Sequence, residues 1–338
     1  MKLSVLDQSV SCAGRDEAHA LADTLDLAPY CEGLGYHRFW VSEHHGLPTI
    51  VGSAPEMLMA AIAARTRRIR IGSAGVMLPH YSTLKVAEQF GVLQALAPGR
   101  IDLGVGRAPG SDMRTAMALN PNAGHAAEQF PQQIVDLQAW TTGRPHQGIV
   151  AHPRPPEGAD LPEIWVLGSS DYGAQLAAHL GLPYAFAYFF MDGQGVEQAL
   201  GLYRSLYRPS QRHPKPQATI CVWALVAPTA DEARFHALGR ERWRVDRQRG
   251  VLGPLQAPAA IAARGFTPEE MPVVEALRAR AFVGTAGEVG LRLRALAAEL
   301  QLDELVVNTW AHDPMVRRVS YRLLAEEFGL QIAKPPRA

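Results

Sequence analysis

The sequence predicts a closed (β/α)8 barrel, the TIM barrel, and three observations support this fold class. Short β-rich apolar runs alternate with longer helical patterns almost to the end of the 338-residue chain. Eight such runs occur, each combined with a helical stretch, which is the repeat of this barrel. Several runs, such as Trp165-Val166-Leu167, are apolar on both sides of the strand alternation, as expected for parallel strands that helices cover on both faces. Because α/β barrels of this length often form one unit, we expect residues 1–338 to be a single domain.

The strands are predicted from the apolar runs, and the helices from apolar residues at three- and four-residue spacing. In chain order, we expect strands at residues 3–6, 39–42, 69–77, 101–105, 164–167, 184–190, 220–227 and 304–309. We expect helices at residues 18–34, 55–64, 84–96, 126–140, 172–180, 195–207, 231–243 and 289–300. Capping chemistry supports two of these boundaries, since Thr83 can cap the third helix and Asp171 the fifth.

Two segments interrupt the alternation, one after the fourth strand and one after the seventh. They cover residues 108–124 and the Pro-, Gly- and Ala-rich residues 247–284. Because loops at the carboxyl ends of barrel strands carry function, we expect both insertions to cover a site. A doubly wound open sheet is the alternative fold, but it has a glycine fingerprint near its first strand, and Gly14 is the only glycine among residues 9–16.

The composition argues against several classes of protein. Lys and Arg together number 33, as do Asp and Glu, so the chain lacks the basic excess of a nucleic-acid-binding protein. No apolar window approaches ~18 residues, and the first residues form no apolar signal-peptide centre, so we expect no membrane span and a cytoplasmic protein. The three distant cysteines predict neither a disulfide framework nor a zinc knuckle. We interpret the basic run at residues 240–249 as a solvated helix face.

Polar and aromatic side chains follow the ends of several predicted strands, and parallel strands all finish on the same side of a barrel. The candidates for this shared rim are Asp7, Glu43, His44, His45, Ser73, Arg107, Gly168, Ser169, Ser170, Tyr188, Trp310 and His312. Adjacent His44 and His45 should point to opposite faces of a strand, so at most one enters the barrel mouth. No H-x-H or H-E-x-x-H spacing occurs either, so we expect no metal site and disfavour a metal-dependent hydrolase.

The turn from Gly168 to Asp171 is a candidate phosphate site. A strand ends, small residues follow, and a helix opens directly, which presents free amides and hydroxyls to an anion. Arg107, just past another strand end, could add a bidentate positive partner. The alternative is that Ser169 and Ser170 only cap the helix. No glycine-rich nucleotide loop accompanies them, which favours a mononucleotide over a dinucleotide.

Several segments together resemble the flavin-dependent luciferase-like monooxygenase family, the bacterial luciferase type. They are residues 40–45 (WVSEHH), 71–79 (IGSAGVMLP), 85–89 (KVAEQ), 98–107 (PGRIDLGVGR) and 283–285 (VGT). The family has a (β/α)8 barrel, in agreement with the strand count.

The resemblance implies a flavin site with assigned residues. It implies a cis peptide between Ala74 and Gly75 behind the isoalloxazine ring, with Ser73 beside it. It implies phosphate contacts from Arg107, from the turn formed by Gly168, Ser169 and Ser170, and from the backbone amide of Tyr172. The family has a further arginine in the loop after the fourth strand, for which the nearest match here is His125. Gly106 stands where luciferase has a reactive cysteine, so light emission is not implied.

The resemblance also implies His44 as the catalytic histidine at the reactive edge of the flavin, where the ordinary pKa of histidine, near ~6.5, suits proton transfer. The alternative is a histidine packed at the barrel rim. We expect a substrate pocket with Asp7, His45, Tyr188 and Trp310, whereas Trp140, Trp165 and Trp223 are expected to pack between barrel and helices.

The activity implied is a monooxygenase that uses reduced FMN, supplied by a separate flavin reductase, and O2. In this family the two give a C4a-(hydro)peroxyflavin that hydroxylates, epoxidises or inserts oxygen beside a carbonyl of a small organic substrate. The alternatives are a reductase or dehydrogenase that uses the deazaflavin F420, and a flavin-binding protein without catalysis. We expect a homodimer, in which the Ala-rich helix at residues 55–64 permits close approach, with neither nucleic acid nor membrane as a partner.

Overall fold

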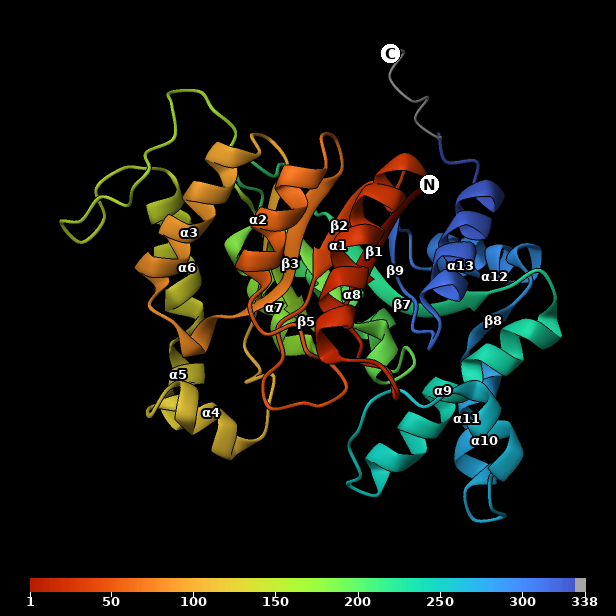
Figure 1. Ribbon diagram of the computed structural model, residues 1–338. Coiled ribbons are helices and arrows are strands. Elements are labelled where there is room, and N and C mark those ends of the chain that lie inside the picture. The colour runs from red at the N-terminus through yellow and green to blue at the C-terminus, as the bar shows by residue number, and fades with distance from the viewer. Residues whose placement is uncertain (332–338) are drawn as a thin grey trace.

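Eight parallel strands close into a barrel with helices around it in the computed structural model, which describes residues 1–331 (Figure 1). The barrel strands are β1 (Lys2–Asp7), β2 (Arg38–Val41), β3 (Arg70–Met77), β4 (Ile101–Gly106), β5 (Glu163–Gly168), β6 (Tyr184–Phe186), β7 (Ala218–Val226) and β9 (Glu304–Asn308). Each strand from β1 to β5 pairs with the next strand in sequence, and β6 pairs with β7. The strand β9 pairs with both β7 and β1 and so closes the barrel. This circuit confirms the predicted closed barrel and excludes the open sheet.

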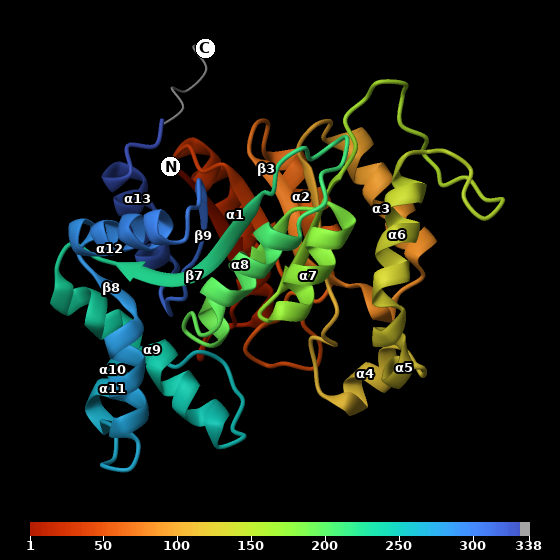
Figure 2. The ribbon, with the colours of Figure 1, turned by 180° about the vertical axis from the view of Figure 1, so that it is seen from behind.

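Helices connect the strands, and two groups of shorter helices extend the loops. The longer helices are α1 (Glu17–Gly33), α2 (Pro55–Arg65), α3 (Thr83–Leu96), α6 (Phe130–Thr141), α7 (Asp171–Leu180), α8 (Val196–Leu206), α9 (Ala230–Gln248), α12 (Ala286–Glu299) and α13 (Pro314–Glu327). The shorter ones are α4 (Met113–Leu119), α5 (Ala123–Ala126), α10 (Pro258–Arg264) and α11 (Met271–Arg280). In both ribbon views α4 and α5, and on the other side α9 to α11, project beyond the same end of the barrel (Figures 1 and 2).

Several boundaries differ from the sequence prediction. The strand expected at residues 184–190 ends at Phe186, and Tyr188–Phe190 form a 3-10 turn. A ninth strand, β8 (Phe282–Gly284), pairs with the end of β7 and was not predicted, because three residues are too short to show a period. The helix α13 was also missed, since its buried face includes Arg317 and Ser320 and so lacks a continuous apolar stripe. The residue at the N-cap position is Ser82 for α3 and Ser170 for α7, one residue before each predicted cap.

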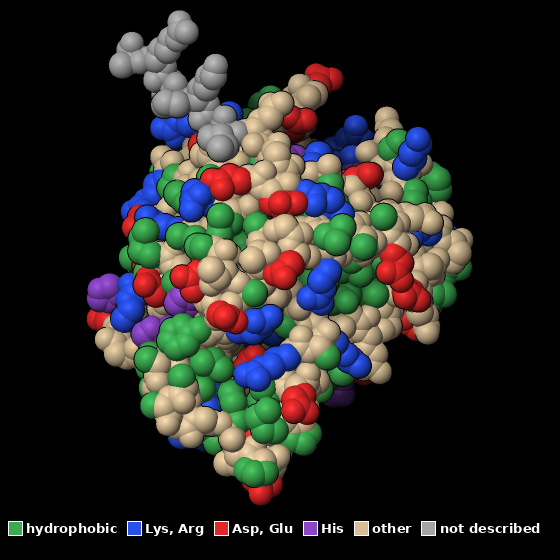
Figure 3. Space-filling view, turned by 90° about the vertical axis from the view of Figure 1, so that its right-hand side faces the viewer, with side chains coloured by type: hydrophobic (Ala, Val, Ile, Leu, Met, Phe, Trp, Pro, Cys, Tyr) green, Lys and Arg blue, Asp and Glu red, His purple; other side chains and the backbone are tan. Residues whose placement is uncertain are grey.

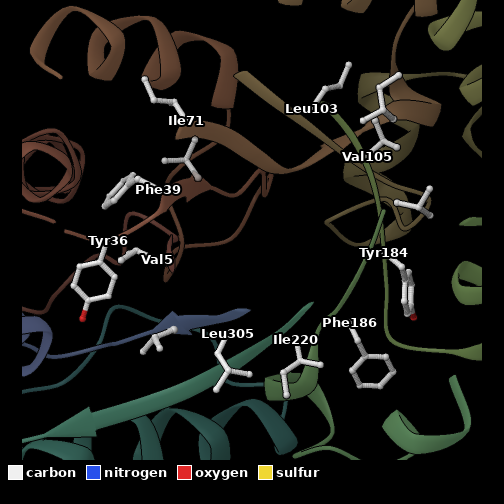
Figure 4. Close-up of a cluster of buried hydrophobic side chains, with 14 of the residues drawn as sticks. Val5, Tyr36, Phe39, Ile71, Leu103, Val105, Tyr184, Phe186, Ile220 and Leu305 are labelled. Carbon is white, nitrogen blue, oxygen red and sulfur yellow. The ribbon is translucent and has the colours of Figure 1, made fainter. Parts of the chain in front are cut away.

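Alternation along the strands separates two apolar regions. One set of side chains points outward and packs under the helices, as Figure 4 shows for Val5, Phe39, Ile71, Leu103 and Ile220. The intervening positions point into the barrel, and their apolar members are Leu6, Trp40, Trp165, Ala185, Cys221 and Val306. Fully burying one large apolar side chain stabilises the fold by about 1.5–3 kcal/mol.

A charged cluster fills the barrel interior near the amino ends of the strands. The buried Arg38 guanidinium donates to Asp102 Oδ2 and Glu163 Oε2, each at 2.9 Å, and to Glu304 Oε1 at 3.0 Å. Trp40 Nε1 also donates to Asp102 Oδ2, at 2.9 Å. These partners satisfy the buried charges, as a closed barrel end requires. The apolar layer above this cluster supports the site at the opposite end.

The molecular surface mixes charges of both signs. Figure 3 shows Lys and Arg side chains interspersed with Asp and Glu over the face that turns toward the viewer. Among residues 1–331, no helix is both long and apolar enough to cross a membrane.

Candidate active site

A cavity of about 260 Å³ opens at the carboxyl ends of the barrel strands. The predicted cofactor-binding residues that line it are Ala74, Gly75, Arg107, Gly168, Ser169, Ser170 and Tyr172, and the predicted catalytic residue His44 lines it as well. Its remaining walls are mostly carbon, from Leu6, Trp40, Phe130, Leu167, Ala185, Phe186, Phe189, Phe190 and Val306. Larger cavities of about 450 and 490 Å³ lie elsewhere and contain none of the predicted site residues.

The wall formed by β3 is irregular where it borders this cavity. The peptide between Ala74 and Gly75 is cis, as predicted, and the register between β3 and β4 shifts between Ser73 and Val76. A Cβ atom at Gly75 would lie 2.8 Å from the backbone carbonyl oxygen of Gly104, which cannot move aside as a side chain can, so glycine is required at this position. Ser73, also predicted as a cofactor residue, does not line the cavity: its side chain is fully buried and donates to the Gly104 carbonyl at 2.8 Å. Ser73 holds the irregular wall instead.

The amino end of α7 forms an open anion cradle. Ser170 is the N-cap residue, but its hydroxyl makes no capping hydrogen bond, so the interpretation of the serines as simple caps does not hold. Ser169 and Ser170 are exposed toward the cavity with the first amides of a ten-residue helix behind them. The Arg107 guanidinium lies 4.0 Å from the centre of the Tyr172 ring, and stacking of this kind fixes it beside the cradle. This arrangement combines a positive charge, hydroxyls and a helix terminus, which is the chemistry that binds phosphate.

His125, the nearest match to the further phosphate-binding arginine of the family, lies away from the cradle. It lies exposed on α5 and does not line the cavity. Among the described residues that line this cavity, Arg107 is the only Lys or Arg.

His44 stands at the boundary between this cavity and a neighbouring one of about 360 Å³, and it lines both. The backbone amide of His44 donates to the Gly52 carbonyl at 2.9 Å, and Ser42 Oγ lies 3.3 Å from its Nδ1. Burial lowers the pKa of His44 to about 4, and the neighbouring His45 and Arg247 add to this effect. The ring is therefore neutral at neutral pH, which corrects the expectation of an ordinary histidine pKa.

Glu43 organises the residues that follow β2. Its buried Oε1 accepts from Tyr81 Oη at 2.7 Å and lies 2.8 Å from His45 Nε2, while its Oε2 accepts from the Met77 amide at 3.1 Å. Tyr81 was not predicted, because its role depends on a contact across 38 positions of sequence. His44 and His45 both line the second cavity, contrary to prediction, because β2 ends at Val41 and strand alternation does not apply beyond it.

Two of the four predicted substrate-pocket residues line the second cavity, namely His45 and Trp310. Asp7 does not: its buried carboxylate accepts from Thr24 Oγ1 at 2.6 Å and from Arg317 Nη1 at 2.7 Å. Tyr188 also points elsewhere, with its ring centre 6.2 Å from that of Phe282. Neither residue lines either cavity, because the end of a strand fixes the position of a residue but not the direction of its side chain.

The basic run on α9 is not a solvated helix face. Arg240, Arg244 and Arg247 line the second cavity, and Arg242 is buried in ion pairs with Asp246 and Glu270. Trp223 lines this cavity and Trp165 points into the barrel interior, so neither packs between barrel and helices as expected. Trp140 is buried in the cluster under the helices, as expected. No group of three or more His, Cys, Asp or Glu side chains in the described residues is arranged to hold a metal ion.

Comparisons with known proteins identify the family of this chain. The family model described as "Luciferase-like monooxygenase" matches residues 1–304. The "Luciferase-like monooxygenase" of Escherichia coli K12 is 40% identical over 323 residues, which are 95% of each chain. The "N-acetyl-S-alkylcysteine monooxygenase" of Bacillus subtilis is 36% identical over 336 residues, 96% of this chain and 98% of that protein. The crystal structure of apo-MsnO8 is 35% identical, covers 98% of this chain and 99% of its own, and has a TM-score of 0.91.

Two more distant structures share the fold. The oxygenating constituent of 3,6-diketocamphane monooxygenase from Pseudomonas putida, in complex with FMN, is 18% identical with a TM-score of 0.72 and full coverage of both chains, 100% each. An F420-dependent secondary alcohol dehydrogenase is 16% identical with a TM-score of 0.65, covering 96% of this chain and 97% of its own. The family model and the relatives of 35–40% identity show that this chain belongs to the luciferase-like monooxygenase family.

Proposed function

We propose that this protein is a flavin-dependent monooxygenase that uses reduced FMN and O2 to oxygenate a small organic substrate. The observation that carries the proposal is that His44 lines two neighbouring cavities. One cavity combines an anion cradle with carbon walls, and the other is large enough for a small molecule.

The residues of the first cavity fit FMN. The phosphate would be bound by Arg107, by the hydroxyl of Ser169 and by the free amides at the start of α7. The flavin ring would lie among carbon surfaces that include Ala74, Gly75 and Leu167. Reduced FMN supplies the electrons with which O2 is activated, a reaction that no protein side chain provides.

His44 would act at the boundary between cofactor and substrate. Its neutral ring can accept a proton there and pass it on, and Ser42 beside Nδ1 orients the ring. Phe189 and Phe190 line both cavities and cover this boundary with apolar surface, which excludes water from the reacting atoms.

The leading alternative is an F420-dependent dehydrogenase on the same barrel. The longer acidic tail of F420 favours further Lys or Arg near the phosphate, and Arg107 stands alone in the first cavity among the described residues. This favours FMN. The second cavity beside His44 favours an enzyme over a flavin-binding protein without catalysis.

Anaerobic titration with reduced FMN and, separately, with reduced F420 tests the assignment. We expect tight binding of FMN alone, together with a changed rate of flavin reoxidation when O2 is admitted. Tight binding of F420 without FMN binding would establish the alternative, and binding of neither would remove the proposal.

We also propose two partners, a flavin reductase that delivers reduced FMN and a second copy of this chain. The homodimer is supported by exposed apolar side chains on α2 and α3, where Met57, Val92 and Leu96 are 69%, 48% and 63% exposed. Side chains of this kind on neighbouring helices favour contact with another protein surface. We further propose that the chain acts in the cytoplasm as one domain.

A further inference from the structure

The second cavity carries an excess of positive charge. Arg240, Arg244 and Arg247 lie at positions i, i+4 and i+7 of α9, so they share one face of the helix, and all three line the cavity. Asp112, at the N-cap of α4, is the only acidic residue among the described residues that line it. This cavity contains none of the residues of the phosphate cradle, so the arginines form a separate anion-attracting surface.

Arg240 is the buried arginine of the three, whereas Arg247 is exposed, and Arg240 lacks a sufficient partner. It is 8% exposed, and its guanidinium lies 4.2 Å from the centre of the Trp223 ring. In the described part of the chain its guanidinium makes no hydrogen bond, and the carboxylate oxygen that it pairs with, Asp192 Oδ1, is 3.9 Å away. Asp192 is committed to Arg244, whose Nη2 lies 3.1 Å from Asp192 Oδ2. A buried guanidinium in this state is costly unless an anion joins it.

Trp223 forms the cavity wall on which Arg240 stacks. Its Nε1 is buried and has no hydrogen-bond partner among the described residues. Burial and the neighbouring Arg244 lower the pKa of Arg240, as expected where positive charges meet without enough negative charge. Because the Trp223 Nε1 atom is covered, the Arg240 guanidinium stacked on the Trp223 ring is the group that a carboxylate can reach.

The rest of the cavity is apolar. Trp243 and Trp310 pack edge to face with ring centres 4.8 Å apart. Their Nε1 atoms are already bonded, at 2.9 Å to Thr49 Oγ1 and at 3.1 Å to Gln8 Oε1, so they present carbon to a ligand. A ligand with an acid group at Arg240 would therefore extend its apolar part along these rings, toward the boundary at His44.

We infer that the second cavity is a substrate subsite for a carboxylate, bound by Arg240 where it stacks on Trp223, and that the substrate is an organic acid with an apolar or aromatic body. The inference rests on the proposed function for the role of this ligand as substrate. The acid subsite itself is independent of flavin.

Binding of small acids and their neutral amides tests the subsite. The probes are 3-phenylpropanoate and 4-phenylbutanoate, each compared with its primary amide by calorimetry at neutral pH, with and without FMN. Because a hydrogen bond to a charged group is lost in the amide, at least one acid should bind about 10- to 100-fold more tightly than its amide. If both acids bind no more tightly than their amides, or if neither acid binds, the inference is overturned.

Three variants assign the effect to Arg240. Arg240→Met should bring acid and amide within about twofold of each other, whereas Trp223→Phe should weaken acid binding by less than about tenfold. Arg234→Met is the matched control on the same helix, since the Arg234 side chain is 68% exposed and lies outside the cavity, and it should change neither affinity. If the Arg240→Met protein still prefers the acids as the parent does, the subsite is wrong.

Thermal unfolding and FMN titration distinguish an acid subsite at Arg240 from a structural role and from a cofactor site. Because Arg240 lacks a full partner, Arg240→Met should leave Tm unchanged or raise it, and a large decrease would assign Arg240 a structural role instead. FMN titration of the same proteins should show equal affinity. A parent protein that binds the acids but not FMN would refute the proposed function alone, whereas weaker FMN binding by Arg240→Met would place the cofactor in this cavity and overturn the subsite.

Discussion

Arg107 provides the sharpest test of the phosphate cradle. It is exposed, it has no carboxylate within ion-pairing distance in the described residues, and its guanidinium stacks on Tyr172 at 4.0 Å. A phosphate would therefore gain a charge-assisted hydrogen bond without displacing an existing ion pair. Such a bond contributes about 1.5–3 kcal/mol, and exposure to solvent favours the lower half of this range. Arg107→Ala should then weaken binding of reduced FMN by about 10- to 50-fold.

The assay is an anaerobic titration of parent and variant with reduced FMN and with reduced riboflavin, which has no phosphate. Riboflavin should bind both proteins with similar affinity, so the effect is assigned to the phosphate. Arg114→Ala is a suitable control, because Arg114 is an exposed arginine on α4 that does not line the cavity. If Arg107→Ala bound FMN as tightly as the parent, the phosphate site would be elsewhere, and the other cofactor contacts would lose their basis.

Four further predictions concern the site, the fold and the assembly. Ser169→Ala removes a neutral hydrogen bond and should weaken FMN binding less than about tenfold in the same titration, and a larger loss would indicate a role beyond the hydroxyl. His44→Ala should leave FMN affinity nearly intact but slow turnover or divert reduced flavin to hydrogen peroxide. Because burial lowers the pKa of His44 to about 4, protonation of this residue favours the unfolded chain. The free energy of unfolding should therefore decrease as the pH is lowered from ~6.5 towards 4, and it should decrease less steeply in His44→Gln. Arg38→Met leaves the buried Asp102 and Glu304 and the partly buried Glu163 without their shared partner and should cost about 3–5 kcal/mol in chemical denaturation. A near-parental midpoint would show that Arg70, which also pairs with Asp102 and Glu163, compensates for the loss. Light scattering should give twice the 36.8 kDa chain mass at micromolar concentration, and a persistent monomer would contradict the dimer.

The barrel was predictable because its strands are buried on both faces and recur at regular intervals. The cradle was predictable because it depends on local sequence alone. Small residues between a strand and a helix place amides and hydroxyls at the rim of the barrel without help from distant parts of the chain. Asp7 was not predictable in this way: it stands at a strand end, but Arg317, from a helix 310 positions later, holds its carboxylate away from the cavity. That same pairing placed an arginine on the buried face of α13 and hid this helix from a search for apolar periodicity.

The arginines of α9 show a second limit. Spacing along a helix identifies residues that share a face, but it does not show what that face meets. Arg240, Arg244 and Arg247 looked like a solvated stripe, and they meet a cavity because the chain after β7 brings α9 over the barrel mouth. The three-residue strand β8, which pairs with the end of β7, is likewise formed by tertiary contact and carries too few residues to show a pattern.

The central proposal is that FMN occupies the cavity formed by the cradle and the irregular wall of β3. A crystal structure of the protein with FMN tests it most directly. We expect the phosphate within hydrogen-bonding distance of Arg107 and Ser169, and the flavin ring against Ala74 and Gly75 with one edge toward His44. A phosphate bound instead at Arg240, or a ring placed away from the Ala74–Gly75 peptide, would contradict the proposal.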